Sequence, residues 1–153
     1  MERTLFFIKP DCKNPGIDKA TALEVIAFLE DKLRFEGEFT RIHAERTGPM
    51  PKEFWLEFYE PIKEIFPGYE AMCGEFAGKS IALFVYEGEK IAERVKTISG
   101  PTQYRDNVGT NSIRAKFGSP DMGYRTVVHA SNRNDVKREL KVFKKYGLLK
   151  DLK

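Results

Sequence analysis

The sequence predicts an α/β protein of the α+β kind, in which helices cover one face of a four-stranded antiparallel sheet. Short apolar runs typical of strands alternate along the chain with longer segments of helical periodicity. These runs come in pairs joined by helices, which is the order of a split βαβ arrangement. The length of 153 residues fits a single domain over 1–153 that can bury a sizeable core.

Four short runs predict strands because they are apolar, β-branched, or alternate between apolar and polar residues. The first ends at Lys9, and the last, made of Thr126, Val127 and Val128, leads directly into His129. The predicted strands are residues 4–8, 38–46, 80–86 and 126–128.

Helices are predicted where apolar residues recur three or four positions apart. Pro51 can begin one of them, because proline suits the first helical position. Asn132 is a candidate cap for the last helix, whose apolar positions are Val136, Leu140 and Phe143. The other predicted helices are residues 18–35, the segment after Pro51 with Phe54, Trp55, Phe58 and Tyr59, and residues 69–76 and 89–98.

Composition excludes several classes of protein. The net charge of +3 is too small to indicate a nucleic-acid partner. No window approaches the roughly 18 consecutive apolar residues of a membrane span. The chain enters a strand without a signal segment, so we expect a cytoplasmic protein. Cys12 and Cys73 lie far apart, which predicts two reduced thiols.

His129 is one of only two histidines and the first candidate for chemistry. Ala130 and Ser131 follow it and leave space beside the imidazole, which is nucleophilic near neutral pH because its ordinary pKa is about 6.5. The alternative is a half-buried histidine satisfied by a backbone carbonyl. Neither His43 nor His129 has Cys or His partners at ligand spacing, so no protein-bound metal is predicted.

A second group of residues is suited to phosphate or a nucleotide. Residues 101–123 contain few apolar side chains and read as one long loop, which in a compact domain is usually functional or disordered. No Walker loop is present, so a nucleotide would not be held by a glycine cradle. The candidates are Lys9 at a strand end, Lys96 near a helix end, Thr102, Arg105 and Arg114 in the loop, and the aromatic Tyr59 and Phe66. The alternatives are solvated charges and core aromatics.

Taken in order, these residues resemble the nucleoside diphosphate kinase family. Each motif is weak alone, but together they follow the family's order over most of the chain. The matching motifs are Arg3-Thr-Leu-Phe-Phe-Ile-Lys-Pro-Asp11, Phe58-Tyr59, Val85-Tyr-Glu-Gly88, Ser99-Gly-Pro-Thr102, Gly109-Thr-Asn-Ser-Ile-Arg114 and Val127-Val-His-Ala-Ser131.

The resemblance implies a ferredoxin-like fold, and a ping-pong transfer of the γ-phosphate of ATP to a nucleoside diphosphate through a phosphohistidine at His129. Lys9 would contact the moving phosphate, Tyr59 would lie beside the histidine, and Glu139 would orient the imidazole. The nucleotide would be held by Lys9, Phe66, Lys96, Thr102, Arg114 and Thr126. Mg²⁺ would arrive with the nucleotide, and the chain would form a homo-oligomer with no membrane or nucleic-acid partner.

Some positions depart from the family pattern. Lys96 stands where the family usually has arginine, Thr126 where it has asparagine, and Asn132 where it has aspartate. The stretch 12–16 also differs, and the spacing from Gly109 to Arg114 is longer. These departures leave open a catalytically weakened, nucleotide-binding or regulatory relative of the same fold. A third reading, an unrelated ferredoxin-like nucleic-acid binder, is disfavoured by the nearly neutral charge.

Overall fold

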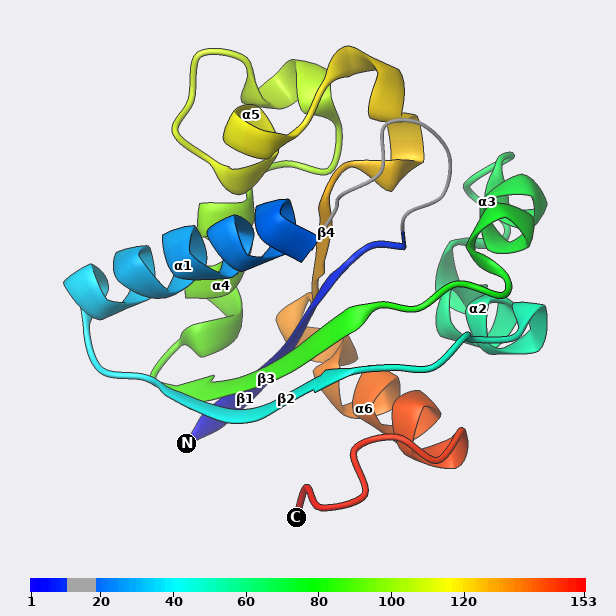
Figure 1. The fold of residues 1–153 in the computed structure, drawn as a ribbon, viewed down its shortest axis with the longest axis horizontal. Coiled ribbons are helices and arrows are strands. Elements are labelled where there is room, and N and C mark those ends of the chain that lie inside the picture. The colour runs from blue at the N-terminus through cyan, green and yellow to red at the C-terminus, as the bar shows by residue number, and fades with distance from the viewer. Residues whose placement is uncertain (11–18) are drawn as a thin grey trace.

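The computed structural model describes residues 1–10 and 19–153, which form a four-stranded antiparallel sheet with the order β2-β3-β1-β4 (Figure 1). The first strand lies in the middle of the sheet and pairs with both β3 and β4. This order is that of a ferredoxin-like split βαβ fold and confirms the predicted fold class. The strands are β1 Glu2–Ile8, β2 Thr40–Arg46, β3 Ala82–Gly88 and β4 Val128–Ala130.

The helices lie close to their predicted positions. The first residue of the first predicted helix, residue 18, lies outside the described residues. The same holds for Asp11 and Cys12. The α-helices are α1 Lys19–Glu36, α2 Lys52–Phe58, α3 Tyr69–Phe76, α4 Ile91–Ser99, α5 Ile113–Phe117 and α6 Val136–Lys145. Short 3₁₀ segments are η1 Glu60–Ile62, η2 Tyr104–Asn107, η3 Pro120–Arg125 and η4 Arg133–Asp135.

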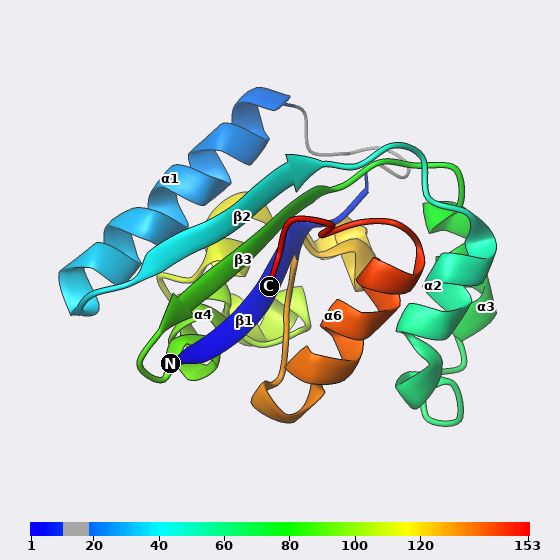
Figure 2. The same ribbon diagram turned by 90° about the horizontal axis from the view of Figure 1, so that it is seen from below.

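The prediction that helices cover only one face of the sheet is wrong. Leu5 and Phe7 of β1 belong to a core cluster with residues of α2, α3 and α6, whereas Phe6 and Ile8 belong to a second cluster with residues of α1 and α4. Figures 1 and 2 show α1 and α6 on opposite sides of the sheet. A central strand that is apolar at successive positions needs cover on both faces. We call these the α6 face and the α1 face.

The prediction that residues 101–123 form one long loop is wrong. This segment contains η2, α5 and part of η3. Polar side chains hold this segment together. The Asn107 amide donates to the carbonyl of Pro101 at 2.8 Å and accepts from the Ser112 hydroxyl at 2.6 Å. Ser112 also caps α5 by accepting from the amide of Ala115 at 3.0 Å. Apolar periodicity cannot reveal structure that rests on such local hydrogen bonds.

The last strand begins later than predicted. Thr126, Val127 and Val128 were expected as the strand, but β4 starts at Val128 and includes His129. Val127 has a φ of 61°, and the amide of Val128 donates to the carbonyl of Thr126 at 2.7 Å. These residues therefore form a three-residue turn that redirects the chain immediately before the strand.

Asn132 does not cap the last helix, contrary to the prediction. Its side-chain amide donates to the Asp135 carboxylate at 3.2 Å, and η4 intervenes before α6 begins at Val136. The predicted apolar positions of α6 nevertheless face the core: Val136 and Phe143 are buried and Leu140 is partly buried.

Within the described residues, no helix combines the length and the apolar character that a membrane crossing requires.

Candidate active site

The imidazole of His129 lies on the α6 face, packed among aromatic rings. His129 pairs across the sheet with Phe7 of β1, and the two rings stack with centroids 4.8 Å apart. The rings of Phe58 and Tyr59, at the end of α2, meet the imidazole edge-on at 5.2 and 6.0 Å. Only 17% of the histidine side chain is exposed, so its orientation is closely defined.

Glu139, in the first turn of α6, is the partner of this imidazole. His129 Nε2 lies 2.9 Å from Glu139 Oε1, and the same oxygen accepts from the Ser131 hydroxyl. The partner of His129 is thus a carboxylate and not the backbone carbonyl of the alternative reading. Glu139 reaches the site because α6 packs its apolar stripe, including Phe143 one turn further on, against β1 and α2.

The ionisation of Glu139 determines which nitrogen of His129 carries the proton. Burial alone raises the pKa of this carboxyl. The charge of His129, the hydrogen bonds from His129 and Ser131, and the nearby Arg138 outweigh burial and lower the pKa below its usual value. An ionised carboxylate only accepts hydrogen bonds, so Nε2 must donate. The lone pair of the neutral ring is then on Nδ1.

Arg138 connects Glu139 to the end of α2. Its Nη2 lies 3.7 Å from Glu139 Oε2 and donates to the carbonyl of Phe58 at 3.1 Å. Because Tyr59 follows Phe58 directly, this contact links the carboxylate that orients the imidazole to the helix end that places Tyr59.

Arg114 is buried and binds main-chain carbonyls around the histidine strand. Its Nε donates to Thr126 at 3.3 Å, its Nη2 to Val128 at 2.7 Å, and its Nη1 to Gly100. Burial lowers its pKa to about 10, opposed by the influence of Tyr59, so the guanidinium is charged at neutral pH. Described residues engage three of its five N–H groups, which leaves two for other acceptors.

Lys9 lies where β1 leaves the sheet, and its main-chain N–H donates to the carbonyl of Val127 at 3.0 Å. This places Lys9 beside the turn that precedes His129. Thr126 is buried at the same turn, where its carbonyl accepts from both Arg114 and Val128.

Three predicted nucleotide-binding residues make no contact with His129 among the described residues. Phe66 is half-buried and packs against the core cluster of the α6 face. Thr102 and Lys96 are exposed. Lys96 lies on α4, whose apolar residues pack on the α1 face, away from the imidazole.

Phe7, Ser131 and Arg138 contact the site but were missed as site residues. Ser131 had a signal, because residues two apart in a strand point to the same face and His129 is two positions earlier. Phe7 had none, because its pairing with His129 appears only once β1 and β4 are adjacent. Arg138 neighbours Glu139 in sequence, but its contact with Phe58 depends on the packing of α6 on α2.

Within the described residues, no group of three or more His, Cys, Asp or Glu side chains could hold a metal ion. Cys73 is a free, buried thiol, and burial raises its pKa to about 11. The thiol is therefore protonated at neutral pH and is not a nucleophile.

A ferredoxin-like sheet that presents a carboxylate-oriented imidazole beside buried and half-buried cations has the parts of a group-transfer enzyme. The family model described as nucleoside diphosphate kinase matches residues 2–146. The chain belongs to the nucleoside diphosphate kinase family, and it is a phosphotransferase that moves a phosphate from a nucleoside triphosphate to a nucleoside diphosphate. The resemblance found in the sequence is thereby confirmed.

Relatives share sequence over most of this chain. The nucleoside diphosphate kinase of Aquifex aeolicus is 30% identical over 146 residues, which is 86% of this chain and 85% of that protein. The Streptomyces griseus protein of the same name is 29% identical over 149 residues, covering 93% and 95%. The solved Aquifex aeolicus structure superposes with a TM-score of 0.71 at 28% identity, covering 92% and 93% of the two chains. The Encephalitozoon cuniculi enzyme, at 19% identity, has a TM-score of 0.76 over 94% and 88%, and shows the likeness of fold.

Proposed function

We propose that this chain transfers the γ-phosphate of ATP to a nucleoside diphosphate by a ping-pong mechanism through a phosphohistidine at Nδ1 of His129. The observation that supports this most directly is the contact of 2.9 Å between Nε2 of His129 and Glu139. It commits Nε2 as a donor and leaves the lone pair on Nδ1.

In the first half-reaction, the Nδ1 lone pair attacks the γ-phosphorus and the bond to the bridging oxygen breaks, so the nucleoside diphosphate leaves with that electron pair. The positive charge that the ring gains is balanced by Glu139 through Nε2–H. In the second half-reaction, a terminal oxygen of another nucleoside diphosphate attacks the phosphorus and the P–N bond breaks. The lone pair returns to Nδ1, and no proton is gained or lost overall.

Phosphoryl transfer requires positioning and positive charge more than covalent help from the protein. We assign the charge to Lys9 at the moving phosphate and to the two remaining N–H groups of Arg114. Magnesium enters bound to the phosphates of the nucleotide. Tyr59 borders the imidazole, and the nucleotide is held further out by Phe66, Lys96, Thr102 and Thr126.

A weakened, nucleotide-binding relative is the second candidate, and one observation favours it. The guanidinium of Arg114 binds three backbone carbonyls. Fewer N–H groups of Arg114 are then available to a phosphate. The chain also has Lys96 in place of the family's usual arginine.

The experiment is incubation with γ-labelled ATP and magnesium, followed by a chase with unlabelled nucleoside diphosphate. The proposal requires a labelled chain whose label is lost in acid, kept in base and discharged by the chase. His129→Ala removes the label, and the matched control His43→Ala, which replaces the other histidine, retains it. Label on the His129→Ala variant would exclude His129 as the acceptor. Nucleotide binding without label would favour the second candidate.

The proposal also includes one domain over 1–153, homo-oligomeric assembly and a cytoplasmic location. Light scattering on the purified protein tests the assembly, because it measures the mass in solution directly.

A further inference from the structure

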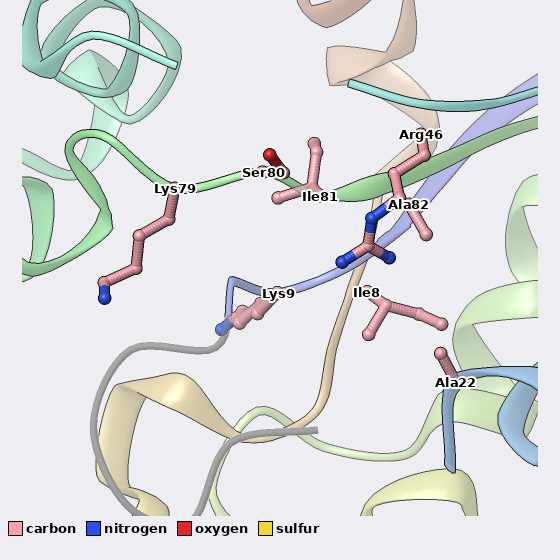
Figure 3. A pocket seen from close by; sticks show the side chains of 8 residues that line it. All are labelled: Ile8, Lys9, Ala22, Arg46, Lys79, Ser80, Ile81 and Ala82. Carbon is pink, nitrogen blue, oxygen red and sulfur yellow. The ribbon is translucent and has the colours of Figure 1, made fainter. Parts of the chain in front are cut away.

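A second group of positive side chains surrounds a pocket at the end of the sheet, on the α1 face. The pocket has a volume of about 240 Å³ and lies between β1, the end of β2 and the start of β3 (Figure 3). Of the eight described residues that line it, Lys9, Arg46 and Lys79 are cations and none is acidic. We call this the basic pocket.

The sheet separates the basic pocket from the imidazole. Ala82 of β3 pairs with Ile8 on one side and with Arg46 on the other, and paired residues in antiparallel strands share a face. Phe7 pairs with His129, and neighbouring residues of a strand point to opposite faces. The row of Ile8, Ala82 and Arg46 therefore lies on the face opposite His129.

The pocket exists because small side chains line it where larger ones fill the rest of this face. Ala82 and Ala22 face the pocket, whereas Phe84 and Phe28 pack into the core of the same face. Figure 3 shows the guanidinium of Arg46 extending toward Ile8, and the side chain of Lys79 extending away from Arg46.

The backbone that carries these cations is held rigidly. Thr47, next to Arg46, exchanges two hydrogen bonds with Ile81: its N–H donates to the Ile81 carbonyl at 2.9 Å, and its hydroxyl accepts from the Ile81 amide at 3.0 Å. The carbonyl of Lys79 accepts from the amide of Met50 at 3.0 Å. The backbone positions of Arg46 and Lys79 beside the pocket are therefore fixed by these hydrogen bonds.

Arg46 and Lys79 have no side-chain hydrogen bond or ion pair with any described residue. Other arginines among the described residues pair with carboxylates, as Arg3 does with Glu87 and Arg41 with Glu30. Like charges around one pocket repel each other, and a multivalent anion between them relieves this repulsion.

We propose that the basic pocket binds a small phosphate-class oxyanion, namely inorganic phosphate or pyrophosphate, independently of His129. The guanidinium of Arg46 supplies a fork for two anion oxygens, and the ammonium group of Lys79 supplies a point charge. The hydroxyl of Ser80, on the same opening, adds a neutral donor.

The test is calorimetric titration of the full chain with inorganic phosphate and, separately, with pyrophosphate, at low chloride. The variants are Arg46→Ala/Lys79→Ala, the matched control Lys141→Ala/Lys150→Ala, which removes the same charge from exposed positions outside the pocket, and His129→Ala. We expect one anion per chain in the wild type, in the matched control and in His129→Ala. The pocket variant should lose at least about tenfold in affinity.

The two titrations distinguish a monophosphate from a diphosphate ligand by which of them binds more tightly. Amide chemical shifts of Ile8 and Ala82 give a second measurement that needs no variant, and both should move as the anion is added. Absence of binding to the wild type would overturn the proposal, as would equal binding by the pocket variant. His129→Ala is expected to bind the anion, so the titration tests the basic pocket without testing phosphotransfer. Failure of the proposed phosphotransfer would be seen in the labelling experiment instead.

Discussion

The guanidinium of Arg114 brackets Val127, donating to the carbonyl of the residue before it and to the carbonyl of the residue after it. Val127 has a φ of 61°, which is unfavourable for a β-branched side chain and costs about 1–3 kcal/mol. The side chain of Val127 is fully buried. A buried arginine thus stabilises a strained turn. His129 follows this turn directly and lies in β4.

The strain at Val127 predicts an unusual order of stabilities. Val127→Gly should be more stable than Val127→Ala by about 1 kcal/mol, because glycine tolerates positive φ and alanine does not. At the neighbouring Val128, which is equally buried but lies in the strand, the order should reverse by about 0.5–1 kcal/mol. Urea unfolding of the four variants measures this. The same order at both positions would show that Val127 is not strained.

Arg114 should matter more than Arg105, the exposed arginine of the same segment. Arg114→Ala removes one donor from each of three carbonyls and should cost about 2–4 kcal/mol of stability, with a loss of phosphate transfer. Arg105→Ala should stay within about 0.5 kcal/mol. Arg114→Lys retains the charge but not the fork and should resemble the alanine variant. Small, equal losses for Arg114→Ala and Arg105→Ala would contradict both roles assigned to Arg114.

Glu139 should make stability depend on pH in the acid range. Its pKa is lowered in the folded protein, so the ionised carboxylate stabilises the fold above the unfolded pKa of about 4.3. That contribution is lost as the pH falls through the folded pKa. Between about pH 5 and pH 3 the wild type should therefore lose more thermal stability than Glu139→Gln.

The exposed Glu64→Gln serves as the control for this titration and should follow the wild type across the same range. Parallel curves for the wild type and Glu139→Gln would show that the contact with His129 does not stabilise the fold.

Lys96 provides a test of where the nucleotide lies. If it reaches the phosphates, Lys96→Arg should preserve or tighten nucleotide binding, because the planar fork can hold two oxygens, and Lys96→Ala should weaken it. The alternative is a solvated lysine on α4, for which neither change should exceed about 0.5 kcal/mol. Calorimetric titration with a nucleoside diphosphate measures all three proteins. Identical dissociation constants would remove Lys96 from the site.

The sequence was informative about the site where a signal is local. His129 was marked by its small neighbours, Lys9 by its place at a strand end and Tyr59 by its aromatic ring, whereas the role of Glu139 was implied only by the resemblance to the family. The structure brings Glu139 and Tyr59 into contact with the imidazole and places Lys9 beside the preceding turn. Among the described residues it does not bring Phe66, Lys96 or Thr102 into contact with His129, because Phe66 packs against the core cluster of the α6 face and Lys96 and Thr102 are exposed.

By itself, the sequence determined the order of strands and helices, the ferredoxin-like class and the family. It also determined that His129 is the first candidate for chemistry. These follow from periodicity and from motifs that are contiguous in the chain. Only the tertiary structure decided that both faces of the sheet are covered, that Phe7 stacks on His129, that Arg114 bridges the two sides of Val127, and that Arg46 and Lys79 open on one pocket. The physical reason is that these features join residues far apart in the chain. Which side chains meet depends on strand register and helix packing, and neither appears in any short stretch of sequence.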